Sequence, residues 1–168
     1  GDGRADRFVR FAENLSIPTS LTFANGGVIC TNGSEMLFLA DRDGDDQAEE
    51  RTVLFDGFRM GDTHAGVSNL RYGLDGWVYA TVGYSGFSGV VGGQSHNSSQ
   101  GVFRCLADGS ELEFLQHTTN NTWGLGFTEE FDVVGSTANG NPSFYLSFPA
   151  AAYARAGMQQ GRTPRADS

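Results

Sequence analysis

The sequence predicts an all-β fold, and three observations lead to that prediction: its turn-rich composition, its short alternating apolar stretches, and motifs that recur along the chain. Its 168 residues include 24 glycines and 13 phenylalanines but only four prolines. Such a composition favours short strands joined by tight turns over long helices. The length is sufficient for one domain with a hydrophobic core of its own.

Recurring hairpin motifs indicate which all-β architecture to expect. Related stretches read "SLTFANGGVICTNG" from Ser20, "NLRYGLDGWVYATVG" from Asn69 and "GLGFTEEFDVVGSTANG" from Gly124. Each resembles a short strand, a turn and a second strand with alternating residues. Leucines 21, 70 and 125 occupy equivalent places in the three stretches, so the repeat length is about 50 residues.

Further strands complete the first two repeats. We expect strands at residues 36–40 and 51–55 in the first, and at 101–105 and 112–116 in the second. A four-stranded antiparallel unit that repeats at this interval is typical of β-propeller blades. A sandwich or jelly roll is the alternative, but neither has a reason to repeat its motifs.

The predicted domain is a partial β-propeller of about three blades, spanning residues 1–149. It would contain the outer strand of one blade near residues 7–11, two whole blades and the inner half of another. The opening "GDGRADR" looks like half of an aspartate loop, so we expect a fragment truncated at both ends. Residues 150–168 would form a tail or begin an insertion within a blade.

Charge and composition exclude several classes of partner. Acidic residues outnumber basic ones, 20 against 11, for a net charge of -9. Nucleic acids and anionic membranes require clustered cations, so we expect neither as a partner. No apolar stretch is long enough to span a membrane. Cys30 and Cys105 lie in apolar stretches outside any CxxC motif, which favours buried free thiols over a disulfide.

An acidic loop is the first candidate site. Asp41, Asp43, Asp45 and Glu49 occupy positions 1, 3, 5 and 9 of a DxDGDxxxE pattern, spacing that can point several oxygens at one Ca²⁺ ion. Asp46 replaces the glycine that an EF-hand has at position 6. The alternative is a solvated acidic turn without metal. Because the loop joins the third and fourth strands of a blade, any calcium here would be structural.

The loops that connect successive blades are the second candidate site. His64 lies in the first of them and would act as a general base, with Asp62 near enough to orient it. Asn120, Asn121 and Trp123 lie in the next one, where amides bind polar ligands and an indole stacks on them. Residues 83–101, rich in glycine and serine, would form a mobile rim on the same face. Each of these residues has an alternative structural role.

Several ordered motifs resemble one family. "DTHAGVSNLRYGLDGWVY", "GVFRCLADGSELEFLQHTTNNTWGLGF" and "NGNPSF" resemble the soluble glucose, aldose sugar and sorbosone dehydrogenases, which are six-bladed, quinone-dependent β-propellers. They are most similar to the membrane-bound dehydrogenase domain of large bacterial envelope proteins. The similarity covers about residues 1–149.

The resemblance implies a function and a set of roles. His64 would be the catalytic base in the oxidation of a sugar or alcohol, with Asn120, Asn121 and Trp123 at a pyrroloquinoline quinone cofactor. It also implies a periplasmic or envelope location and a downstream haem c domain. Asn120 stands where the family has a cofactor-binding arginine, and Thr122 where it has proline. The alternative function is a non-catalytic, calcium-stabilised propeller that binds carbohydrate or a protein partner.

Overall fold

Two four-stranded antiparallel sheets form the first and second blades of the computed structural model, which describes residues 2–140, 142–146 and 148–163. Both sheets have the strand order expected of blades, with each strand beside the one that follows it in its repeat. The first contains β1 (Leu21–Ala24), β2 (Gly27–Asn32), β3 (Glu35–Ala40) and β4 (Glu50–Asp56). The second contains β5 (Val67–Tyr72), β6 (Trp77–Val82), β9 (Gly101–Leu106) and β10 (Leu112–His117).

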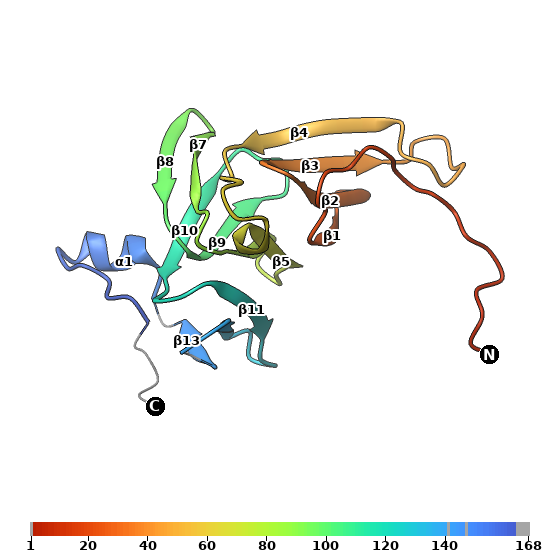
Figure 1. Cartoon of the computed structure of the whole chain (residues 1–168). Helices are drawn as coiled ribbons and strands as arrows, with labels where there is room; N and C mark the ends of the chain where they lie inside the picture. Colours follow the sequence, from red (N-terminus) through yellow and green to blue (C-terminus); the bar gives the residue numbers. More distant parts are fainter. Residues whose placement is uncertain (1, 141, 147, 164–168) are drawn as a thin grey trace.

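A third sheet continues the series. It contains β11 (Thr122–Phe127), β12 (Val133–Thr137) and β13 (Phe144–Leu146), one strand more than the predicted inner half of a blade. The first strands of the three sheets, β1, β5 and β11, are neighbours, while β4 and β10 lie on the outside (Figure 1). The prediction of an all-β, partial propeller with four-stranded antiparallel blades is therefore confirmed.

The glycine-rich segment predicted to be a mobile rim is instead an ordered hairpin of β7 (Phe87–Val91) and β8 (Gln94–Ser98). It docks on the end of β4, where the Ser88 amide donates to the carbonyl oxygen of Gly57 at 2.8 Å. A Cβ at Gly89 would lie 2.3 Å from the Asp56 carbonyl oxygen, so only glycine permits this approach. The close backbone contact orders this segment, and the composition, which suggests flexibility, does not reveal that contact.

Four phenylalanine rings hold this hairpin between the first two blades. Phe58 lies 6.0 Å from Phe55, 5.0 Å from Phe87 and 5.6 Å from Phe103, measured between ring centroids. These separations and the tilted or edge-on angles are those that aromatic quadrupoles favour. All four rings are buried in the largest hydrophobic core. The cluster therefore fixes β4, β7 and β9 relative to one another.

The expected outer strand near residues 7–11 is wrong. The structure has no strand there, and the carbonyl oxygen of Phe11 accepts one hydrogen bond, from the Ala48 amide at 2.8 Å. Phe11 and Leu15 pack on buried Cys30 and Leu37, covering the face of the first sheet that points away from the second. Among the described residues no strand pairs with this segment, so its alternating sequence forms no ladder.

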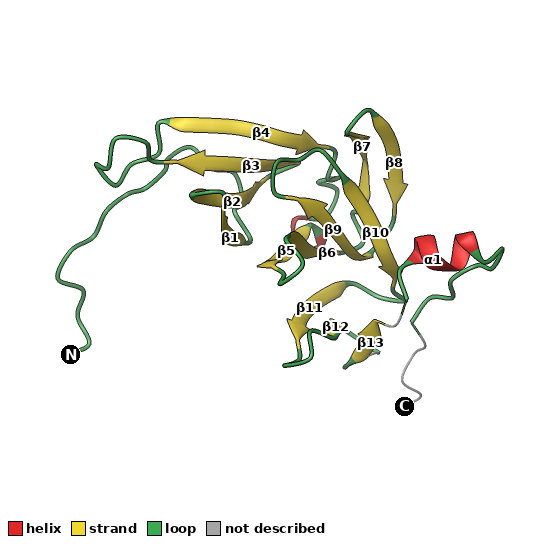
Figure 2. Cartoon of the chain, turned by 180° about the vertical axis from the view of Figure 1, so that it is seen from behind, coloured by secondary structure: helices red, strands yellow, loops and turns green. Residues whose placement is uncertain are grey.

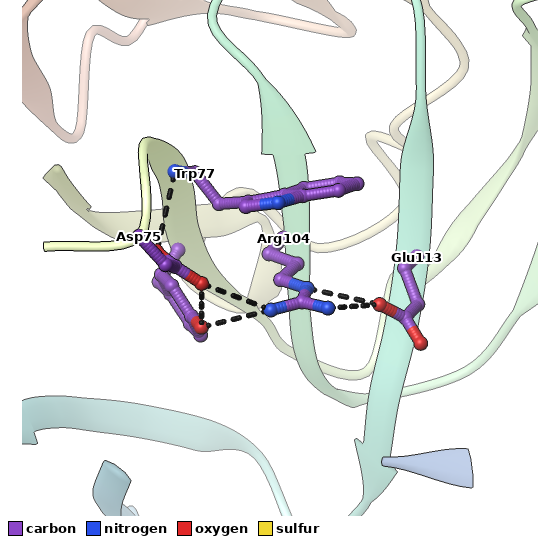
Figure 3. Close-up of polar contacts among 5 residues, drawn as sticks. Asp75, Trp77, Arg104 and Glu113 are labelled. Carbon is purple, nitrogen blue, oxygen red and sulfur yellow. Dashed lines mark hydrogen bonds and ion pairs between the residues drawn. The ribbon is translucent and has the colours of Figure 1, made fainter. Parts of the chain in front are cut away.

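Arg104 lies at the centre of a polar network on the face of the second blade opposite the phenylalanine cluster (Figure 3). Its guanidinium group forms ion pairs with Asp75 at 3.0 Å and Glu113 at 2.7 Å, and its Cζ atom lies 4.5 Å from the Trp77 ring centroid. The Tyr79 hydroxyl donates to Asp75 at 2.8 Å. Because two acids already pair with the cation, this network is structural and leaves Arg104 little capacity for a ligand.

The chain then returns to the second blade (Figure 2). Helix α1 (Ala150–Arg155) packs near β10, and the Thr163 amide donates to the carbonyl oxygen of His117 at 3.1 Å. Residues 164–168 of the predicted tail lie outside the described residues. Among the described helices none is both long and apolar enough to cross a membrane.

Removal of the Phe87 ring should destabilise the fold strongly. We expect Phe87→Ala to lower the free energy of unfolding by about 3–5 kcal/mol, because the cavity cannot be refilled without moving the hairpin. Phe8→Ala, which truncates a side chain that is 88% exposed, should change it by less than about 0.5 kcal/mol. Urea unfolding followed by circular dichroism measures both, and equal effects would contradict the assigned core.

The free cysteines confirm the predicted thiols and provide a second test. Both are buried, and burial raises the pKa of Cys105 to about 12. This thiol contributes stability that is fully present below the ordinary value of 9.0 and is lost as the pH rises toward 12. We expect a thiol-reactive chromophore at pH 8 to label neither cysteine in native protein and both in denaturant. Rapid native labelling of Cys105 would show that this core is open.

Candidate functional site

Asp62 and His64 lie in the connection from the first blade to the second. A single 3-10 turn (Thr63–Ala65) places them, and the Asp62 carboxylate caps it by accepting the His64 backbone amide at 2.9 Å. The imidazole Nδ1 lies 3.6 Å from the Asp62 carboxylate, and the His64 side chain is 90% exposed. The imidazole is thus open to solvent with an acid beside it, as expected from the sequence.

Residues 83–86, which follow β6, hold that turn in place. The Ser85 hydroxyl donates to the Asp62 carbonyl oxygen at 2.9 Å and accepts the Asp62 amide at 3.3 Å. The Ser85 amide donates to the carbonyl oxygen of Ala65 at 3.1 Å. A Cβ at Gly83 would lie 2.7 Å from the same oxygen, so the two segments touch through their backbones.

Asn121 joins the next blade connection to this turn. Its side-chain amide donates to the His64 carbonyl oxygen at 3.3 Å, and its side-chain oxygen accepts the Tyr84 amide at 3.3 Å. Asn120 is adjacent, and its side-chain oxygen accepts both the Asn121 amide, at 2.7 Å, and the Tyr84 hydroxyl. Loops from successive blades therefore converge in one cluster: Asp62, His64, Tyr84, Ser85, Asn120 and Asn121, which we call the polar cluster.

Trp123 stands beside this cluster without being bonded to it. It belongs to β11, its side chain is 43% exposed, and its carbonyl oxygen accepts the Asn69 side-chain amide at 2.5 Å. Among the described residues no hydrogen bond joins its indole to the polar cluster. The structure thus brings together four of the five residues predicted for this site.

The polar cluster has the wrong charge for the expected quinone. A ligand with three carboxylates requires cations around it, preferably arginine. None of the described residues that hydrogen-bond within the cluster is an arginine. Position 120, where the dehydrogenases that the sequence resembles have one, carries a neutral amide. These residues do not fit pyrroloquinoline quinone. They fit a neutral ligand with hydroxyl groups, which amides, imidazole and carboxylate can bind as donors and acceptors.

The acidic loop lies at the opposite end of the first blade. It joins β3 to β4, whereas the polar cluster follows the far end of β4 (Figure 1). One oxygen from each of Asp41, Asp43, Asp45 and Glu49 lies within 4.8 Å of the others. The amides of Gly44 and Asp46 donate to Asp41 at 2.6 and 2.8 Å, and these bonds, the first above all, lower the pKa of Asp41.

The loop also has the backbone conformation that its sequence left in doubt. Asp46 replaces the glycine expected at the sharp turn, yet its φ is +70°, in the left-handed region that glycine normally occupies. Aspartate is among the few other residues that enter this region readily. The substitution therefore preserves the turn, and the four predicted residues could hold a hard cation.

Sequence reasoning placed residues 83–101 on the face of the site as a rim but did not single out Tyr84 and Ser85 as members of the site. They follow a predicted strand and precede a glycine, which resembles an ordinary turn, and their contacts to Asp62 and Asn121 involve backbone atoms. The available signal was their position: they leave the second strand of a blade on the same side as His64. Strand order alone would have placed them beside it.

Comparisons with known proteins give one match. The family described as "Domain of unknown function (DUF7133)" matches residues 1–167. Neither the curated proteins nor the solved structures contain a match. Because the similarity extends over nearly the whole chain, this protein belongs to the DUF7133 family.

Proposed function

We propose that the polar cluster binds a sugar or another polyhydroxylated alcohol and that His64 accepts a proton from a substrate hydroxyl. One observation carries the proposal: loops from two successive blade connections and residues 83–86 converge on His64 through hydrogen bonds between described residues. Such convergence of polar groups on a rigid β scaffold is typical of ligand sites.

The proposed chemistry is the oxidation of a carbinol. The substrate hydroxyl would give its proton to the imidazole while the carbon transfers hydride to a two-electron acceptor such as the quinone added in the assay below, so that the carbinol becomes a carbonyl and the quinone a hydroquinone. Asp62 would stabilise the imidazolium that forms, since its carboxylate lies 3.6 Å from Nδ1. Asn120, which is partly exposed, would orient another hydroxyl, while the buried Asn121 side chain holds the loops of Tyr84 and His64 together. No step is assigned to pyrroloquinoline quinone, because the cluster lacks the cations to hold it.

The second candidate is a non-catalytic propeller that binds carbohydrate or a protein partner. The substitution of asparagine for arginine at position 120 favours it, because binding neutral hydroxyl groups needs no cofactor. The resemblance to envelope dehydrogenases supports the catalytic alternative, with a periplasmic or envelope location and a haem c domain downstream as electron acceptor. Fold alone does not decide between them, because propellers serve both purposes.

The catalytic proposal is tested by removing the imidazole. In the full-length protein, with calcium and with or without added quinone, we expect dye reduction by an aldose or alcohol panel. His64→Ala should reduce the rate by about 10²–10⁴-fold, the usual contribution of a general base. His96→Ala, which alters a histidine on β8, is the matched control. Undiminished turnover in His64→Ala would overturn the proton-acceptor role, and saccharide binding without turnover would favour the second candidate.

We also propose that the acidic loop holds a structural Ca²⁺ ion. Its support is the approach of four carboxylates within 4.8 Å, together with the left-handed turn at Asp46. Hard oxygen ligands at this spacing match calcium coordination, and the turn points them inward. The ion would brace the β3–β4 end of the first blade, and we assign it no part in the chemistry at His64.

Calcium should therefore raise the melting temperature of the protein. At a calcium concentration a hundredfold above Kd, the expected stabilisation is about 2.7 kcal/mol. Asp43→Ala should abolish this increase, whereas Glu129→Ala, which removes an exposed acid from another loop, should leave it intact. Identical melting curves with calcium and with a chelator would exclude the site.

A further inference from the structure

We propose that Tyr84 is the platform on which a pyranose ring stacks, which makes it a ligand-binding residue of the polar cluster. This inference rests on the proposed function and specifies its ligand: a cyclic sugar instead of an open-chain alcohol. Tyr84 lies immediately after β6, between Gly83 and Ser85. Its assignment depends on three features: how the ring is held, how much of it is open, and what surrounds it.

Both ends of Tyr84 are fixed by hydrogen bonds. Its hydroxyl donates to the Asn120 side-chain oxygen, and its backbone amide donates to the Asn121 side-chain oxygen at 3.3 Å. A Cβ at Gly83 would lie 1.9 Å from that same Asn121 oxygen, so only glycine fits beside Tyr84 at this close approach. The ring is thus immobilised before any ligand arrives, which reduces the entropic cost of binding.

The ring nevertheless remains open, since Tyr84 is 51% exposed. A tyrosine held at both ends could bury its ring against the protein, as Tyr79 does in contact with Phe127 and Phe131. Tyr84 instead presents apolar aromatic surface next to bonded polar groups. That combination of a rigid apolar face and nearby hydrogen-bonding groups is what an amphipathic ligand requires.

The surrounding groups define the ligand. The Asn121 side chain bonds the backbone amide of Tyr84 and the backbone carbonyl of His64, so one side chain holds these two residues near each other. The Ser85 hydroxyl bonds the Asp62 backbone, so the residue next to Tyr84 holds the turn that carries the carboxylate. A pyranose has an apolar C–H face for the aromatic ring and equatorial hydroxyls for amide, imidazole and carboxylate. Anionic ligands are disfavoured because Asp62 and the net charge of -9 repel them.

Variants at position 84 separate the ring from its hydroxyl. Isothermal titration calorimetry of the full-length protein would use methyl glycosides of common hexoses, with sorbitol as the open-chain comparison. We expect Tyr84→Phe to retain affinity within about threefold and Tyr84→Ala to lose about tenfold or more, the magnitude of one aromatic contact. Tyr72→Ala, which removes a tyrosine that is 47% exposed near the end of β5, should bind like the wild type.

A second measurement detects the stacking directly. Sugar C–H protons over an aromatic face shift upfield in NMR spectra, and Tyr84→Leu should abolish that shift while keeping an apolar side chain at this half-exposed position. Wild-type affinity and unchanged shifts in Tyr84→Leu would overturn the stacking role but leave the proposed function standing. Absence of saccharide binding by the wild-type protein would overturn both.

Discussion

Phe58 contacts three other phenylalanine rings, and much of the structure depends on that contact. It follows β4, touches the β7–β8 hairpin through Phe87, and reaches the second blade through Phe103. A blade buries hydrophobic residues on both faces and therefore needs a neighbour on each side. The phenylalanine cluster satisfies that need between the first two blades. It also anchors the connection that carries Asp62 and His64, so the contacts that pack the core also position these site residues.

Strand prediction succeeded where a residue's own pattern decides its structure. The strands expected at residues 36–40 and 101–105 differ from the observed ones by a single residue, because buried apolar side chains mark them directly. Strand prediction failed where the structure of a segment depends on whether another segment pairs with it. Residues 7–11 alternate like a strand but have nothing to pair with, and residues 87–98 read as a loop but pair with each other. Whether a segment finds a pairing partner is not encoded in its composition.

The same division holds for the polar cluster. His64 and Asn121 could be placed because loops between blades must emerge on one face, which strand order determines. Tyr84 and Ser85 could be placed on that face only as part of the segment 83–101, because their contacts to the Asp62 backbone and to Asn120 and Asn121 depend on how closely the loops approach. At the acidic loop the ligand spacing could be predicted from the sequence, whereas the left-handed φ of Asp46 is visible only in the structure. Side-chain chemistry can be predicted from the sequence, whereas backbone geometry at close contacts cannot.

The hydrogen bonds that Asn120 accepts from its neighbours show what an arginine at this position would change. Its side-chain oxygen accepts hydrogen bonds from the Tyr84 hydroxyl and the Asn121 amide. Arginine has five donors and no acceptor, so it could not accept either bond. The arginine that the dehydrogenase resemblance leads one to expect would therefore release the Tyr84 ring and the Asn121 backbone together. Asparagine at position 120 and tyrosine at position 84 form a matched pair, and the loss of a cation is linked to the presence of an aromatic platform. The substitution thus argues against a tricarboxylate cofactor at this position, and the proposal of a neutral cyclic ligand rests on the same two residues.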